Sequence, residues 1–191
     1  MARLLYIHGF LSSSRSQKAL ETADWIAGRE LPIEFLCPSL SNDPRRATAQ
    51  LAAIADECDG EPLGLVGSSL GGFYATWLSQ TRGLPAVLVN PAVRPQDHLD
   101  AYLGPNQNPY TGEKFEVDAD FLQSLAAIDV DPLPAPEKLL VMLQTGDETL
   151  DYRQALDKYA ASRQIVENGG DHRFQNYDRH LPTIMEFLRL P

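Results

Sequence analysis

Short apolar runs alternate along the chain with segments in which apolar residues recur at helical spacing. The runs are continuous rather than alternating with polar residues, which is typical of strands that are buried on both faces. They predict strands at residues 4–7, 33–36, 63–66, 86–89, 139–143 and 164–167. Helical spacing predicts helices at 16–27, 44–57, 70–80, about 152–161 and 180–188. This order indicates an α/β fold, a three-layer α/β/α sandwich around a mostly parallel sheet of about six strands.

Residues 94–137 interrupt this alternation. The segment contains a turn-rich piece at 104–112 and a helical piece near 118–128, but no further strand of the main sheet is expected there. Connections this long in a compact domain usually have a function. We favour a small cap insertion over the carboxyl edge of the sheet, and the other interpretation is an irregular packing segment. In both cases residues 1–191 are expected to form a single domain.

Composition narrows the class of protein. Of 191 residues, 43% are hydrophobic and 22% charged, the balance of a globular domain, and the formal net charge is −10. The acid excess argues against nucleic-acid and anionic-membrane partners, which need clustered Lys and Arg. No apolar run approaches the ~20 residues of a membrane helix. Only Cys37 and Cys58 are present, which predicts free thiols, and no signal-peptide pattern is found, so a cytoplasmic location is expected.

The sequence Gly67-Ser68-Ser69-Leu70-Gly71 lies between a predicted strand and a predicted helix. The pattern G-x-S-x-G in this context is typical of a nucleophile elbow, in which the neighbours two before and two after the serine have no room for a side chain. This spacing selects Ser69 rather than Ser68 as the nucleophile. A plain small-residue turn is the other interpretation; a phosphate-binding loop is disfavoured because no Lys follows.

An activated serine needs a base and an acid that orients the base. Of the four histidines, His172 follows the last predicted strand, as the order Ser, Asp, His requires, and His180 is the second candidate. Asp147 follows the fifth strand and is the preferred acid. Asp151 is the alternative, although it could instead cap the next helix, and Glu148 is expected to be solvated.

Two backbone N–H groups should stabilise the oxyanion of a tetrahedral intermediate. One belongs to Leu70, the residue after the nucleophile. The other is expected from Phe10 in the loop after the first strand, where His8 is expected to brace the loop rather than transfer protons. No His, Cys and carboxylate cluster has metal-ligand spacing, so no metal or cofactor is expected.

These motifs together resemble the α/β-hydrolase superfamily and, more narrowly, the YqiA-type esterases. The resemblance rests on Tyr6-Ile7-His8-Gly9-Phe10, Gly67-Ser68-Ser69-Leu70-Gly71-Gly72, Asn90-Pro91-Ala92, Asn106-Gln107-Asn108-Pro109-Tyr110-Thr111-Gly112, Gln144-Thr145-Gly146-Asp147-Glu148 and Gly169-Gly170-Asp171-His172. It implies a shortened hydrolase fold without the two leading antiparallel strands. It also implies a cytoplasmic enzyme that acts on carboxylic esters or acyl thioesters with the triad Ser69, Asp147 and His172.

The expected function is therefore a serine esterase that works through an acyl-enzyme, with thioesters such as acyl-CoA as a further substrate class. A hydrolase-fold binding protein with little or no turnover is the alternative, and a peptidase or carbon–carbon bond hydrolase would use the same triad. No obligate protein partner is expected. The net charge favours a neutral ester over acyl-CoA, unless cations near the mouth compensate; the candidates are Arg15, Lys18 and Arg94. Three aromatic residues could line the acyl pocket or belong to the core: Tyr102, Tyr110 and Phe115.

Overall fold

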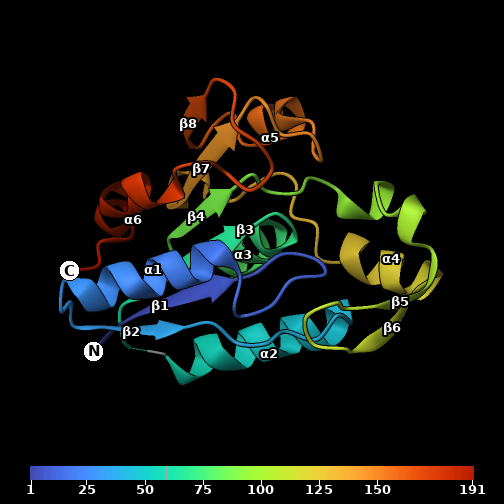
Figure 1. The fold of residues 1–191 in the computed structure, drawn as a ribbon, viewed down its shortest axis with the longest axis horizontal. Helices are drawn as coiled ribbons and strands as arrows, with labels where there is room; N and C mark the ends of the chain where they lie inside the picture. The colour runs from blue at the N-terminus through green and yellow to red at the C-terminus, as the bar shows by residue number, and fades with distance from the viewer. Residues whose placement is uncertain (59) are drawn as a thin grey trace.

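The computed structural model describes residues 1–58 and 60–191. Their central feature is a six-stranded sheet with the strand order β2-β1-β3-β4-β7-β8 (Figure 1). Its strands are β1 (Ala2–Ile7), β2 (Ile33–Leu36), β3 (Leu63–Ser68), β4 (Ala86–Val89), β7 (Leu139–Gln144) and β8 (Arg163–Glu167). Every neighbouring pair in this sheet is parallel. The predicted sheet is confirmed, and no antiparallel strand interrupts it within the described residues.

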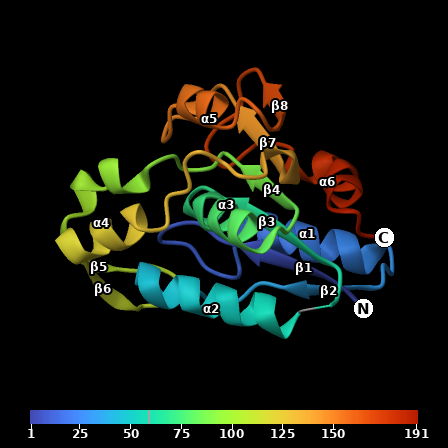
Figure 2. The same ribbon diagram turned by 180° about the vertical axis from the view of Figure 1, so that it is seen from behind.

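Helices cover the sheet on both sides. Those that pack on it are α1 (Gln17–Gly28), α2 (Pro44–Glu57), α3 (Leu70–Arg82), α5 (Tyr152–Lys158) and α6 (Leu181–Leu188). Helices α1 and α6 contribute to the core on one face, and α2, α3 and α5 to the core on the other, as Figures 1 and 2 show from opposite sides. The three-layer α/β/α prediction is confirmed. Within the described residues, none of the helices has the length and apolar content to cross a membrane.

Strand β1 explains why the strand sequences lack a polar alternation. Leu5 and Ile7 face the core formed with α2 and α3, whereas Leu4 and Tyr6 face the core formed with α1 and α6. All four side chains are fully buried. Because successive side chains of a strand point to opposite faces, a strand between two cores needs apolar residues at every position.

The segment 94–137 contains a structure that the sequence analysis missed. Strands β5 (Gly104–Gln107) and β6 (Lys114–Val117) form an antiparallel hairpin separate from the main sheet. The turn is built by the buried Asn108, whose side-chain oxygen accepts the N–H groups of Tyr110 and Thr111 at 2.9 and 3.2 Å. Gly, Pro and Asn are poor strand formers, which is why this hairpin has no apolar pattern to predict it. The expected helical piece is α4 (Ala119–Ala126), and short 3₁₀ turns are η1 (Pro95–Asp97), η2 (Asp100–Tyr102) and η3 (Pro136–Lys138).

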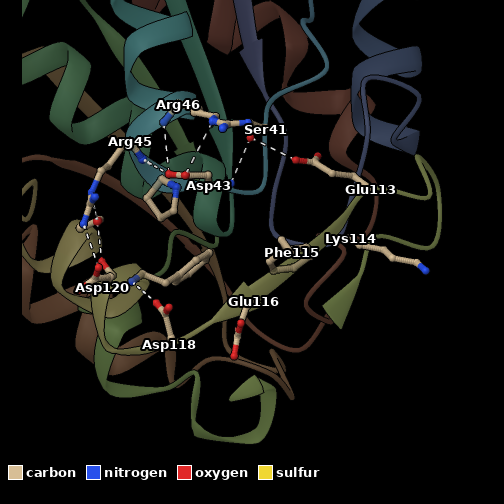
Figure 3. A pocket seen from close by; sticks show the side chains of 13 residues that line it. Ser41, Asp43, Arg45, Arg46, Glu113, Lys114, Phe115, Glu116, Asp118 and Asp120 are labelled. Atoms are coloured by element: carbon tan, nitrogen blue, oxygen red, sulfur yellow. Dashed lines mark hydrogen bonds and ion pairs between the residues drawn. The ribbon is translucent and has the colours of Figure 1, made fainter. Parts of the chain in front are cut away.

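Polar contacts hold this hairpin against the start of α2 (Figure 3). The Glu113 carboxylate accepts hydrogen bonds from the Ser41 hydroxyl at 3.2 Å and the Asn42 amide at 2.6 Å. Arg45 donates to the Ser124 hydroxyl of α4 at 2.8 Å. A hollow of about 360 Å³ remains between α2, β6 and α4, and two ion pairs line it, Arg45 with Asp120 and Arg46 with Asp43. Asp43 caps α2 by accepting the Arg45 N–H at 2.8 Å.

The same segment reaches the loop that follows β1. The ring of Phe10 lies edge-on to Tyr102, Phe115 and Phe121, with ring centroids 5.1, 5.8 and 6.5 Å away. Asn108 also donates its side-chain N–H to the carbonyl of Ser12 at 2.9 Å. In both ribbon views, β1 and β2 point toward the side of the molecule where α4, β5 and β6 lie (Figures 1 and 2). The segment thus lies at the carboxyl ends of these strands, and its role as a cap stays a prediction.

Candidate active site

A sharp turn between β3 and α3 presents Ser69. Its φ of 56° and ψ of −123° lie outside the regions that non-glycine residues ordinarily adopt. A Cβ atom on Gly71 would overlap the carbonyl oxygen of Ile7, and one on Gly67 would overlap the Gly71 carbonyl and lie 2.7 Å from the Ala75 Cβ. The two glycines that the motif predicts are therefore required by close backbone packing.

The structure brings together the three predicted triad side chains from three loops. The His172 Nε2 atom lies 3.1 Å from the Ser69 Oγ atom, and its Nδ1 atom lies 2.8 Å from Asp147 Oδ2. The loops follow β3, β7 and β8, so the carboxyl ends of the parallel strands supply all three residues. With Nδ1 protonated, Nε2 is free to accept the serine proton.

The candidate acid, Asp147, is positioned by two backbone hydrogen bonds. The Asp147 side chain is only 2% exposed and accepts the N–H groups of Thr149 and Leu150 at 2.9 and 2.8 Å. The alternative acid, Asp151, accepts the Arg153 N–H at 3.0 Å and caps α5, which is the other role weighed for it. Glu148 is exposed, as expected, but also accepts the backbone N–H of His172 at 3.0 Å.

The second candidate base lies elsewhere. His180 ends the 3₁₀ turn η4 (Tyr177–His180), one residue before α6, and its Nε2 atom lies 3.0 Å from the Glu167 carboxylate of β8. It therefore contacts an edge strand and none of the three triad residues.

Two buried amides, which the sequence motifs contained without a role assigned to them, hold the histidine loop. Asn90, just after β4, donates to the carbonyls of Asp171 and His172 at 3.1 and 3.3 Å and accepts the Gln144 N–H at 3.0 Å. The Gln144 side-chain oxygen accepts the N–H groups of Asp171 and Gln175 at 3.2 and 2.8 Å. Both side chains bind backbone atoms, so they fix the path of the loop and with it the position of the imidazole.

The predicted oxyanion donors come from the turns after β1 and β3. Among the described residues, no protein group accepts a hydrogen bond from the N–H of Phe10 or of Leu70. His8 braces the first turn: its Nδ1 atom lies 3.1 Å from the Gly9 carbonyl, and its Nε2 atom accepts the Leu40 N–H at 3.3 Å. Burial lowers the pKa of His8, so the ring is neutral at pH 7, with Nδ1 as the donor.

A cavity of about 260 Å³ adjoins Ser69 and His172. Of the aromatic residues considered, Tyr110 lines it, while Tyr102 and Phe115 pack on Phe10. Of the three candidate cations, Lys18 lines this cavity and Arg15 lines the adjoining one. The third, Arg94, pairs with Asp97 at 2.6 Å and lines neither. Among the described residues there is no group of three or more His, Cys, Asp or Glu side chains placed to hold a metal ion.

Comparison with known proteins identifies the family of this chain. A family model described as "Uncharacterised protein family (UPF0227)" matches residues 3–189. The chain belongs to this family. Two UPF0227 proteins are similar to it over almost their full length. The one from Shewanella woodyi is 28% identical over 194 residues, covering 97% of this chain and 99% of the relative. The one from Serratia proteamaculans is 24% identical, covering 98% and 99%.

Solved structures show that this UPF0227 chain has the α/β-hydrolase fold. Mouse alpha/beta hydrolase domain-containing protein 10 superposes with a TM-score of 0.77 at 19% identity, covering 98% of this chain and 89% of that one. Est1E from Butyrivibrio proteoclasticus, solved with ferulic acid bound, also has a TM-score of 0.77, at 12% identity, covering 99% and 88%. The expected α/β-hydrolase fold is thereby confirmed.

The elbow packing predicts a large cost for a single methyl group. Gly67→Ala should destabilise the protein by about 2–3 kcal/mol or more, because the Cβ has no free volume. Gly28→Ala is the matched control, since a Cβ at Gly28 meets no atom within 4 Å. Denaturant unfolding of both variants measures the difference, and equal midpoints would contradict the packing argument.

The buried His8 predicts a pH dependence of stability. Its pKa in the folded state is below the ordinary value of 6.5, so the unfolded state binds more protons as pH falls below about 6.5. The free energy of unfolding should then decrease as pH falls through this window. In His8→Gln, whose amide oxygen can replace Nε2 as acceptor, this part of the decrease should disappear. Urea unfolding between pH 7.5 and 5 tests this prediction. Parallel plots of the free energy of unfolding against pH for the wild type and His8→Gln would refute it.

Proposed function

We propose that this protein is a serine hydrolase that cleaves carboxylic esters. One observation carries the proposal, the continuous hydrogen-bonded chain from the Ser69 hydroxyl through His172 to the buried Asp147. A serine at 3.1 Å from an imidazole, itself oriented by a carboxylate, is the arrangement that activates a hydroxyl for attack on an acyl carbon.

The proposed reaction has two halves. The Ser69 Oγ atom attacks the acyl carbon while His172 Nε2 takes its proton, and the N–H groups of Phe10 and Leu70 stabilise the oxyanion. The intermediate collapses, His172 protonates the departing alcohol or thiol, and the acyl group stays on Ser69. Water then gives a proton to His172 and attacks the acyl-enzyme, which releases the acid and restores the serine. Asp147 keeps the imidazole in the required tautomer and stabilises its charged form.

Several further features support turnover over a pure binding role. Ser69 lies in a strained conformation, and strain of this kind is concentrated at functional sites. Est1E has a similar fold, and so do LipS and LipT, which are described as lipolytic enzymes.

We take the substrate to be a small ester or thioester. The free thiols of Cys37 and Cys58 fit a reducing compartment such as the cytoplasm.

Removal of the nucleophile tests the proposal directly. Hydrolysis of 4-nitrophenyl acetate, butyrate and octanoate should be measured for the wild type, Ser69→Ala and the control Ser124→Ala, which changes a hydroxyl on α4. Ser69→Ala should lower kcat by about 10⁴-fold or more, and the control should match the wild type. If the wild type neither hydrolyses any ester nor reacts with a fluorophosphonate probe, the alternative of a hydrolase-fold binding protein replaces this proposal.

A pair of Asp→Asn variants tests the assignment of the acid. Asp147→Asn should lower kcat by about 10⁴-fold, since the amide favours the wrong imidazole tautomer. Asp151→Asn should stay within about twofold of the wild type, because Asn caps a helix as well as Asp does. Steady-state kinetics on the ester that the wild type hydrolyses fastest decide between the two carboxylates. A larger loss of kcat in Asp151→Asn than in Asp147→Asn would assign the role of the acid to Asp151.

A further inference from the structure

The space beside Ser69 has a charge opposite to that of the whole protein. The cavity of about 260 Å³ that adjoins Ser69 shares Ser12, Lys18 and Arg173, among others, with a neighbouring cavity of about 280 Å³ that Arg15 also lines. Among the described residues no Asp or Glu lines either cavity, although the chain has 26 acidic and only 16 basic residues. The cations of these two cavities are therefore an exception to the composition, although Lys18 and Arg173 also line a third cavity together with Glu21, Asp171 and Asp178.

Two buried hydroxyl groups, of Tyr6 and Ser16, line the cavity beside Ser69. Tyr6 is fully buried and lines the cavity. Its hydroxyl makes no hydrogen bond of normal geometry among the described residues, although the Ser68 and Ser16 hydroxyls are near enough to lower its pKa against the larger effect of burial. The hydroxyl of Ser16, which also lines the cavity, is likewise buried without a partner. Burial raises the pKa of Tyr6 well above its ordinary value, so its phenol is a hydrogen-bond donor at every relevant pH. A buried hydroxyl without a partner costs about 1–3 kcal/mol, which a polar ligand group would offset.

Lys18 adds a full charge beside these hydroxyls. Its Nζ atom donates to the carbonyl of Arg173 at 2.8 Å, and no carboxylate oxygen of the described residues lies within 4.0 Å of it. Ser16, the N-cap residue of α1, makes no side-chain capping bond, so the positive end of this helix lies at the cavity too. An ammonium group, two hydroxyl donors and a helix N-terminus together favour an anionic oxygen group.

We infer that the ester cleaved at Ser69 carries a second, ionised carboxylate, which Lys18, Tyr6 and Ser16 bind. This inference rests on the proposed function, because it names the substrate class of the same site. It also reverses the preference for a neutral ester drawn from the net charge. Long-range repulsion by the whole protein acts on the rate of encounter, whereas the groups within a few ångströms decide which substrate is held.

Matched charged and neutral esters test the inference. The charged ester is 4-nitrophenyl hydrogen adipate, and its neutral counterpart is 4-nitrophenyl 6-methylheptanoate, in which an isopropyl group replaces the carboxylate. A second pair, 3-carboxy-4-nitrophenyl butyrate and 4-nitrophenyl butyrate, places the charge on the leaving group instead. The rate with Ser69→Ala is subtracted in each case. The pair that shows the preference tells whether the bound carboxylate belongs to the acyl or to the alcohol part.

The decisive variant is Lys18→Met. It should lower kcat/KM for one charged ester by about 10- to 100-fold and for the neutral counterpart by less than about threefold. Lys114→Met, which removes the same charge from the exposed hairpin, should leave both values unchanged. An equal loss for charged and neutral esters would mean that Lys18 only positions the loop through the Arg173 carbonyl, and the inference would fail. No loss with either charged ester would also overturn it.

The Tyr6→Phe variant distinguishes a role of the Tyr6 hydroxyl in substrate binding from an effect on stability alone. If its hydroxyl only fills space, removing an unpartnered polar group should raise stability and leave kinetics unchanged. If it binds the carboxylate, stability is kept or raised while kcat/KM for the charged ester falls several-fold. Unchanged kinetics on both ester pairs would remove Tyr6 from the inferred site.

The ionisation of Lys18 gives a second readout. Burial lowers its pKa to about 8, the net result after Glu21, Asp171 and Asp147 raise it and Arg173 lowers it. The plot of kcat/KM against pH reports the free enzyme, so the preference for the charged ester should decline as pH rises through about 8. In Lys18→Arg, which stays charged, the preference should persist to higher pH. A preference that declines identically in both proteins would contradict the role of Lys18.

A failure of the proposed function can be distinguished from a failure of the inferred carboxylate site. If the wild type turns over none of the four esters, the hydrolase proposal fails, and the carboxylate site is then measured by calorimetric titration of Ser69→Ala with adipate. Adipate binding to Ser69→Ala that is lost in the Ser69→Ala/Lys18→Met double variant would support the carboxylate site. No adipate binding to Ser69→Ala would reject it.

Discussion

The geometry of the candidate site depends on one backbone contact, between the first turn of α3 and the end of β1. The Gly71 backbone lies so close to the carbonyl of Ile7 that no side chain fits between them. Since β1 and β3 are neighbours in the sheet, this contact sets α3 directly against the loop after β1. The turn after β1 and the turn at Ser69 are thereby packed against each other, since a Cβ on Gly9 would lie 3.2 Å from the Ser69 Cβ. One close approach therefore both fixes the turn at Ser69 and sets beside it the turn that carries Phe10, whose N–H is the second oxyanion donor of the proposed mechanism.

The other half of the site depends on buried amides rather than on glycine. Asn90 and Gln144 follow or end neighbouring strands, and each binds backbone groups of the loop that carries His172. Backbone groups buried without partners cost about 1–3 kcal/mol each, so these bonds favour one path of the loop over others. A parallel sheet makes the arrangement possible, because the carboxyl ends of β4, β7 and β8 lie side by side.

The elements and triad could be predicted because they follow from local patterns. Uninterrupted apolar runs marked the strands, and the G-x-S-x-G spacing with the order of Ser69, Asp147 and His172 marked the residues that the structure brings together. The β5–β6 hairpin could not be predicted, since side-chain bonds of Asn108 build it instead of an apolar pattern. The environment of Tyr6 was equally hidden: in the sequence it is one apolar position of a buried strand, and only the fold shows that its hydroxyl lacks a partner. The net charge favoured a neutral ester, but it contains no information about where Lys18 lies, and the inferred carboxylate site depends on that position.

The segment 94–137 is an insertion in the chain but not a detachable module. Its Glu113 holds Ser41 and Asn42, the residues next to Leu40, whose N–H is bound by His8. Its Asn108 holds the carbonyl of Ser12, on the other side of the same loop. The turn that carries Phe10 is thus supported from both ends by groups far away in the sequence. A chain reduced to the six strands and their covering helices would keep Ser69 at its turn but lose these supports of the turn that carries Phe10, so the proposed active site depends on the hairpin as well as on the sheet.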